Sequence, residues 1–290
     1  MSAAQRARKA AWTRRALIAP AAIVLGVFLV LPYINIIVMS FRVPAVGAPY
    51  APGFTLNNYL RIFTDSYFLG VLGDTLLLGL TTTIICLLLG YPLAYHLARS
   101  NSRWKSVLYV FVLSPLLVGV VVRSFGWLIL LSGNGVVNQT LIASGLLERG
   151  LQLMNNKLGV TIALVHVFLP FMILPLIGNI QSIDPNLESA GRSLGASRAK
   201  VFWRIFLPLS LPGIQAGSIL VFVLTLSAYV TPVMLGGAQV KTMTVLVVQQ
   251  LVDVFQWPTG AALALVLSLS GAIAVLLYTR FTGRLMRGVA

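Results

Sequence analysis

The fold is decided by residues 184–208, which read DPNLESAGRSLGASRAKVFWRIFLP. This stretch is a polar, positively charged island between two long apolar segments, in a chain whose charged residues amount to only 9%. A segment of this kind lies in water and is suited to contact with another protein. The apolar segments on either side of it are suited to a lipid bilayer and not to water.

The island itself predicts two short helices joined by a turn. Asp184 is a suitable N-cap, Pro185 suits the first helical position, and Glu188 in the first turn complements the positive end of the helix dipole. That dipole contribution, up to ~1 kcal/mol, is by itself a sufficient reason for Glu188. Gly195 can adopt the left-handed conformation that ends a helix, and Ser197 can cap a second one. The second helix carries an apolar face made of Val201, Phe202 and Ile205.

The first of these helices has an apolar stripe of mostly small residues. Leu187, Ala190, Gly191 and Leu194 recur at the spacing of one helix face. Because small side chains let another surface approach the backbone closely, we expect this stripe to face a partner protein.

Composition identifies an all-α membrane protein. Hydrophobic residues make up 58% of the chain and the mean hydropathy is +0.92, with apolar runs of about 20 residues or more. We expect a single transmembrane domain over 16–280, including the cytoplasmic loop at about 181–208, with basic cytoplasmic ends at 1–15 and 281–290. The six predicted spans are Ala16 to Ser40, Gly70 to Leu97, Ser106 to Leu131, Leu158 to Ile180, Leu209 to Leu235 and Thr259 to Tyr278.

The formal charge of +15 has a topological explanation. Six spans place both termini on one side, and 15 of the 21 basic residues then fall on that side. By the positive-inside rule this side is the cytoplasm, so we expect a multi-pass membrane protein with both termini in the cytoplasm and no nucleic-acid partner. The segments 42–69, 133–157 and 241–257 are then external loops, the first of which leads into a short amphipathic helix.

Catalytic and metal-binding motifs are missing from the sequence. It has two histidines, His96 and His166, one cysteine, Cys86, and no cluster with metal-ligand spacing. The stretch Gly236 to Thr242 is only faintly similar to a phosphate loop, because no glycine directly precedes Lys241. We therefore expect neither an enzyme nor a cofactor bound by this chain, and any ATP hydrolysis has to occur on a separate subunit.

The island resembles the cytoplasmic signature of permease subunits of bacterial ABC importers: Glu-Ala-Ala, three residues, Gly, nine residues, then Ile-x-Leu-Pro. Gly195, Ile205, Leu207 and Pro208 fit its second half, whereas Ser189 stands where the signature has Glu, so that Glu188 is displaced by one position. In that family this segment is the coupling helix, which docks in a groove of the ATPase subunit. The resemblance implies ATPase-coupling roles for Glu188, Ser189, Ala190, Gly191, Leu194, Gly195, Ala196, Ile205, Leu207 and Pro208.

Other stretches resemble the spermidine/putrescine branch of these permeases, and its first permease subunit type. They are 90–95, 123–127, 169–175 and 231–237. The resemblance implies a type I ABC importer permease architecture that works by alternating access, with ATP and magnesium held by a partner ATPase dimer. It also implies a second permease subunit, with a heterodimer favoured over a homodimer, and a periplasmic or lipid-anchored binding protein.

Two kinds of alternative stay open at this point. Permeases for ferric iron, opines or amino-acid derivatives share parts of the same pattern. A channel or secondary transporter would need no ATPase, but would more typically place paired ionisable residues near the midplane. The scarcity of acidic residues in the spans counts against a proton-coupled carrier.

Five residues are candidates for the substrate pathway: Asp74, Arg123, His166, Tyr229 and Thr231. Arg123 lies within a span, where a charge costs roughly 3 kcal/mol or more, so it either lines a watery pathway or extends to the lipid headgroups. Asp74 either contacts a cationic substrate or faces external water. His166 is a pathway residue or a hydrogen-bonded packing residue, whereas Tyr229 and Thr231 are candidates for the cavity in the fifth span.

Overall fold

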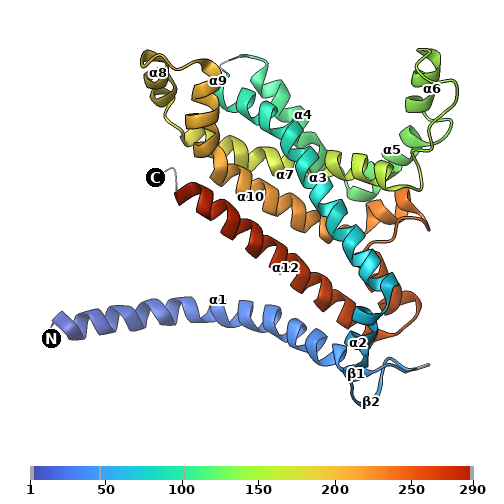
Figure 1. Ribbon diagram of the computed structural model, residues 1–290. Helices are drawn as coiled ribbons and strands as arrows, with labels where there is room; N and C mark the ends of the chain where they lie inside the picture. Colours follow the sequence, from blue (N-terminus) through green and yellow to red (C-terminus); the bar gives the residue numbers. More distant parts are fainter. Residues whose placement is uncertain (1–2, 46, 101, 288–290) are drawn as a thin grey trace. The chain divides into compact units, whose positions relative to one another are not determined.

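The computed structural model describes residues 3–45, 47–100 and 102–287, and these are mostly helical, as predicted (Figure 1). Two compact units are present: residues up to Thr64 with Val247–Leu265, and Asp65–Leu246 with the residues from Val266 onward. The α-helices are α1 (Ala3–Ser40), α2 (Asn57–Thr64), α3 (Ser66–Arg99), α4 (Lys105–Leu117), α5 (Val120–Leu131), α6 (Val136–Ala143), α7 (Lys157–Ser182), α8 (Pro185–Ser193), α9 (Arg198–Val201), α10 (Leu207–Leu226), α11 (Met243–Val248) and α12 (Trp257–Arg287).

Six helical segments of the described residues are long and apolar enough to cross a membrane. The first, second, fourth and sixth segments confirm the predicted spans. Their ends agree to within a few residues, except that the sixth segment continues to Arg284. The segments are Leu17–Ser40, Ser66–Arg99, Val120–Ala143, Lys157–Ser182, Arg198–Leu226 and Trp257–Arg284.

The third predicted span is wrong as a continuous helix. It breaks between α4 and α5, where Val118 has an extended backbone (φ −101°, ψ 132°) and Gly119 is the N-cap of α5. Pro115 has no N–H to donate within α4, and glycine is a weak helix former, so the helix ends there. The long apolar segment is instead Val120–Ala143, which includes α6, a helix that the sequence analysis assigned to an external loop.

The fifth predicted span extends too far. Its helix α10 ends at Leu226, whose carbonyl oxygen accepts a hydrogen bond from Thr244 Oγ1 at 2.5 Å. Residues after it form a separate π-helical turn, η2 (Pro232–Gly236), because Pro232 cannot donate its nitrogen to a continuing helix. Two further elements, α11 and the π-helical turn η3 (Gln249–Asp253), lie in the segment predicted to be a third external loop.

The smaller unit joins α1 to α2 through a two-stranded antiparallel sheet, β1 (Arg42–Val43) and β2 (Ala51–Phe54). Asn58 in α2 donates to the carbonyl oxygens of Ser40 and Arg42 at 2.8 and 3.0 Å. The predicted short helix in this segment is therefore confirmed and is anchored to the end of α1.

The core of the larger unit is formed by α3, α7 and α10, which pack against one another (Figure 1). Met172 and Ile173 of α7 are fully buried in it. Glycines allow the close approach: a Cβ on Gly217 of α10 would lie 2.8 Å from Met172 Sδ, and one on Gly90 of α3 would lie 3.2 Å from Met172 Cγ. Small residues at helix contacts are typical of membrane bundles, where packing and not water exclusion holds helices together.

Candidate functional site

The predicted helix–turn–helix of the polar island is confirmed. Asp184 Oδ1 accepts a hydrogen bond from the Asn186 amide at 2.9 Å, and α8 begins at Pro185. The turn follows with Gly195 at φ +80°, and Ser197 caps α9 by accepting from the Lys200 amide.

Backbone hydrogen bonds close α8 in a Schellman motif. The Ala196 amide donates to the Gly191 carbonyl at 3.1 Å, and the Gly195 amide donates to the Arg192 carbonyl at 2.9 Å. This pattern requires a left-handed residue at Gly195, which glycine adopts without a steric penalty. Gly195 therefore supplies the left-handed conformation that the turn between α8 and α9 requires.

The stripe on α8 does not face outward as a whole, which corrects the sequence interpretation. Gly191 is buried, and a Cβ there would lie 2.8 Å from Ile205 Cδ1 and 3.2 Å from Val201 Cγ2. Its missing side chain therefore lets the second helix of the island approach, not a partner protein. The exposed members form what we call the coupling surface: Leu187, Ala190 and Leu194.

Glu188 does more than complement the helix dipole. Its Oε1 lies 3.4 Å from Nη2 of Arg99, the last residue of α3, and its Oε2 lies 3.8 Å from Nη2 of Arg192. The Arg99 guanidinium also lies 5.6 Å from the centre of the Phe206 ring. Glu188 thus connects α8 to the end of a core helix, a partner that its sequence separation of 89 positions concealed.

The rest of the island continues directly into the membrane bundle. α9 passes through a π-helical turn, η1 (Phe202–Phe206), into α10 without an interruption. The turn suits Pro208, which has no N–H for an ordinary helical bond, while the Leu207 amide donates five residues back to the Phe202 carbonyl. Of the remaining coupling candidates, Ser189 is exposed, whereas Ile205, Leu207 and Pro208 are half-buried.

Three of the five pathway candidates meet between α5, α7 and the segment before η2. Trp127 Nε1 donates to His166 Nδ1 at 3.1 Å, and Ser124 and Thr231 share a hydrogen bond of 3.0 Å between two buried hydroxyls. Arg123 is one turn from Trp127 on α5 and therefore lies on the part of α5 that is next to His166. Trp127 and Ser124 lie in the stretch 123–127 that resembles the spermidine/putrescine branch, but their contacts could not be predicted from the sequence.

Arg123 lies beside the middle of α7. His166 is nine residues from Lys157, the first residue of α7, so it is about 13 Å from that end. Since Leu131 is close to Gly159, α5 runs antiparallel to α7 and Arg123 lies about 6 Å deeper than Trp127. Arg123 is then about 19 Å along α7 from Lys157, beside the middle of that helix.

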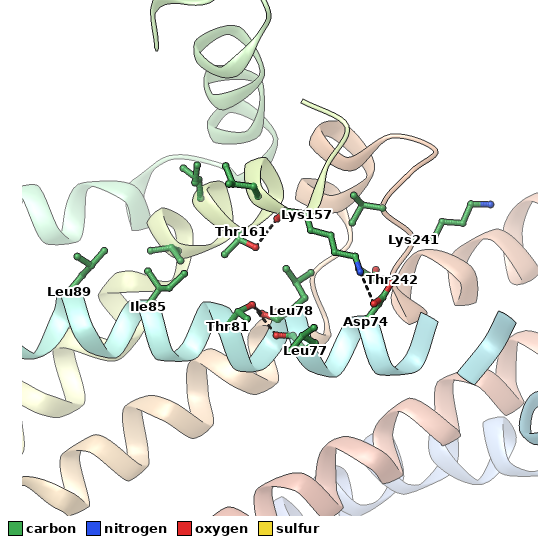
Figure 2. A pocket seen from close by; sticks show the side chains of 14 residues that line it. Asp74, Leu77, Leu78, Thr81, Ile85, Leu89, Lys157, Thr161, Lys241 and Thr242 are labelled. Carbon is green, nitrogen blue, oxygen red and sulfur yellow. Dashed lines mark hydrogen bonds and ion pairs between the residues drawn. The ribbon is translucent and has the colours of Figure 1, made fainter. Parts of the chain in front are cut away.

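The other two candidates are apart from this cluster. Asp74 Oδ1 on α3 pairs with Lys157 Nζ on α7 at 2.6 Å, and both side chains are about half exposed (Figure 2). The pair is part of the lining of a groove of about 480 Å³, to which α3 and α7 contribute mainly leucine and isoleucine. Tyr229 is 39% exposed in the segment between α10 and η2.

A metal site was not predicted, and the described residues contain no group of three or more His, Cys, Asp or Glu side chains arranged to hold an ion. Cys86 lies buried in the core between α3 and α7. Its thiol is 3.6 Å from the Val165 carbonyl oxygen.

Comparison with known proteins identifies the family. Residues 86–287 match the model of the binding-protein-dependent transport system inner membrane component. The chain belongs to this family. It is therefore a transport component of the ABC permease type and not an enzyme, and the alternative of a channel or a secondary transporter is set aside.

Several curated relatives cover nearly the whole chain. The spermidine/putrescine transport system permease protein PotB of Haemophilus influenzae is 32% identical over 262 residues, which cover 90% of this chain and 91% of that protein. PotB of Escherichia coli K12 is 34% identical over 256 residues, covering 88% and 93%. A molybdenum transport system permease protein, ModB of Mycobacterium bovis, is 32% identical over 196 residues, covering 67% and 72%.

Solved structures show the same fold. A chain of a bacterial alginate ABC transporter, in complex with an alginate-bound periplasmic protein, superimposes with a TM-score of 0.76 at 19% identity and covers 97% of each chain. A second structure of an alginate importer gives a TM-score of 0.71 at 18% identity. The predicted type I importer permease architecture is thus confirmed.

Proposed function

We propose that this chain forms half of the translocation pathway of an ATP-driven importer of polyamines such as spermidine and putrescine. The observation that carries the proposal is the combination of an exposed coupling surface with similarity to PotB along about nine-tenths of the chain. PotB proteins belong, by their name, to spermidine/putrescine transport systems.

The island suits the transmission of movement. Its turn is fixed by a Schellman motif, Glu188 ties α8 to the end of α3, and α9 continues into α10. A displacement of α8 by a partner would therefore be passed to two core helices together. We place an ABC ATPase dimer, which binds ATP and magnesium, against Leu187, Ala190 and Leu194, and thus on the cytoplasmic side of the inner membrane with both termini.

Three further partners belong to the proposal. A second permease subunit would complete the pathway, a periplasmic or lipid-anchored binding protein would deliver the substrate on the opposite side, and the bilayer would surround the exposed apolar helices. Helix α1 has many large exposed apolar side chains, which is consistent with contact with lipid or with a second subunit.

The test is reconstitution in liposomes of this chain with its ATPase, second permease and binding protein. We expect spermidine and putrescine to stimulate ATP hydrolysis and to accumulate inside, whereas molybdate and amino acids do neither. Polyamine-independent hydrolysis with no uptake would refute the assignment of the substrate. Loss of all substrate-stimulated hydrolysis, whatever the solute, would refute the assignment as an importer subunit.

A further inference from the structure

The groove of about 480 Å³ runs along one face of α3 and α7 (Figure 2). From Asp74 to Leu89 it follows α3 for about 22 Å. Leu78 and Val165 are buried in its floor, whereas Leu77 and Leu89 at its edge are more than half exposed. The groove is therefore closed below by the core of the larger unit and open on its other side.

The threonines along the groove already donate to their own helices. Thr81 Oγ1 donates to the Leu77 carbonyl at 2.9 Å, and Thr161 Oγ1 donates to the Lys157 carbonyl at 2.7 Å. Away from the charged end, the other lining side chains are leucine, isoleucine and valine. A polyamine needs hydrogen-bond acceptors for its ammonium groups, so this groove suits hydrocarbon instead.

The groove has the cross-section of a single acyl chain and not that of a helix. A volume of about 480 Å³ along about 22 Å gives a mean cross-section of about 22 Å². An α-helix with its side chains is about 10 Å across and needs roughly 80 Å². An acyl chain needs only roughly 15–20 Å², because its carbon atoms pack at about 4 Å from their neighbours. Its length within one leaflet is about 15 Å, half of the hydrocarbon thickness, which the groove accommodates.

The polar end of the groove lies at the membrane surface and carries a positive charge. Lys157 is the first residue of the membrane-length segment Lys157–Ser182, which places this end at the level of the headgroups. Lys157 is paired with Asp74, but no ion pair in the described part of the chain includes Lys241, whose side chain points away from that pair (Figure 2). Two lysines and one aspartate leave one net positive charge, which complements the phosphate of an anionic lipid.

We propose that this groove holds one acyl chain of an anionic phospholipid whose phosphate is bound by Lys241. The hydrocarbon lies along Leu78, Ile85 and Val165, and the headgroup lies in the leaflet on the side where α7 begins. Phosphatidylglycerol has the required chemistry, because its headgroup carries a net negative charge. This lipid site goes beyond the proposed function and does not depend on which solute the transporter carries.

Native mass spectrometry of the full chain in a mild detergent tests the charge at the mouth. Phosphatidylglycerol and phosphatidylcholine are added at equal concentrations. We expect the wild type to bind phosphatidylglycerol about fivefold more tightly, which corresponds to the attraction of one lysine near a membrane surface. Lys241→Gln should remove this preference, whereas Arg149→Gln, at an exposed position that does not line the groove, should keep it.

A second set of variants tests the groove itself. Thr81→Trp places a large ring in the groove and should weaken binding of both lipids at least about tenfold. Leu88→Trp is the matched control, since Leu88 is 68% exposed on α3 and does not line the groove. Leu77→Trp, at the edge of the groove, repeats the test if Thr81→Trp does not fold. Equal binding of the two lipids by the wild type, or wild-type binding by the groove variants, would overturn the proposal.

The second permease is the competing occupant of this face. Phosphatidylglycerol that stays bound in the purified complex of the two permeases would support the lipid site. Loss of the lipid on assembly would mean that the second subunit covers the groove, and would overturn the proposal. None of these readouts uses a transported solute, so failure of polyamine transport would refute the proposed function and leave this test intact.

Discussion

The contact between Glu188 and Arg99 is expected to hold the coupling helix against the membrane bundle. Their side chains are only 15% and 18% exposed, and the closest atoms are 3.4 Å apart. Two unit charges at that distance attract by roughly 5 kcal/mol at an effective dielectric constant of about 20. Most of this is offset by desolvation and side-chain ordering, so we expect a net contribution of about 1–2 kcal/mol.

Glu188→Gln keeps the shape of the side chain and removes its charge. The Glu188 carboxylate compensates the charge of Arg99 at 3.4 Å, but Arg99 Nε and Nη2 make no hydrogen bond in the described chain, so the variant leaves a largely enclosed guanidinium without compensation. Hydrogen–deuterium exchange of the α8 amides in the detergent-solubilised chain should accelerate about 5- to 30-fold, since 1.4 kcal/mol corresponds to a factor of ten. Exchange in the core of α7 should not change.

Arg192→Gln is the matched control. Arg192 also lies beside Glu188, at 3.8 Å, but its side chain is 53% exposed and the pair is an ordinary one along a helix. Such a pair contributes about 0.3–0.5 kcal/mol, so α8 exchange should rise less than about threefold. Equal effects of the two substitutions would refute the reasoning that burial of the pair with Arg99 makes it the stronger contact.

Three other substitutions test the turn, the core and the membrane cluster. Gly195→Ala should destabilise α8 by about 1 kcal/mol through backbone strain alone, since its Cβ would meet open space; unchanged exchange of α8 would contradict this. Gly217→Val should lower the free energy of unfolding by about 1–3 kcal/mol, measured by thermal unfolding, because its side chain would overlap Met172, and Met172→Ala in the same chain should recover part of the loss. Trp127→Phe should lower stability by about 0.5–1.5 kcal/mol, measured by thermal unfolding, because His166 loses its donor; wild-type stability would show that this bond contributes nothing.

The local structure of the coupling loop could be predicted from the sequence because its determinants lie next to one another. Asp184, Gly195 and Ser197 each act within a few residues, through a cap or a left-handed turn. Most spans could be located for a similar reason, since the bilayer demands a continuous run of about 20 apolar residues. Such local rules apply before any tertiary contact is known.

The orientation of α8 could not be predicted, because it depends on contacts between distant residues. The periodicity of the stripe was correct, but which of its members would face the second helix depended on Ile205 and Val201. The ion pair with Arg99 joins positions 89 residues apart. The break at Gly119 could not be predicted because both flanking helices are apolar, so the hydropathy of the sequence shows no interruption there.

The pathway candidates show the same division. The rarity of charge in hydrocarbon was enough to single out Arg123, but its depth follows from the packing of α5 on α7. Asp74 was considered as a contact for a cationic substrate or as a residue in water, and its pairing with Lys157 was not foreseen. Two residues on different helices, 83 positions apart, give no joint signal in a single sequence.

The central claim is that Leu187, Ala190 and Leu194 dock on an ABC ATPase, and site-directed cross-linking tests it most directly. Cys86 is buried, so Cys86→Ser gives a background for single cysteines placed by Ala190→Cys and Leu194→Cys, with Ser144→Cys at the C-cap of α6 as the control. In the assembled transporter, the two α8 cysteines should cross-link to the ATPase with a yield that changes when ATP is added, and the α6 cysteine should not. Cross-linking from α6 alone, or none from α8 in a complex that hydrolyses ATP in response to substrate, would contradict the assignment of this loop.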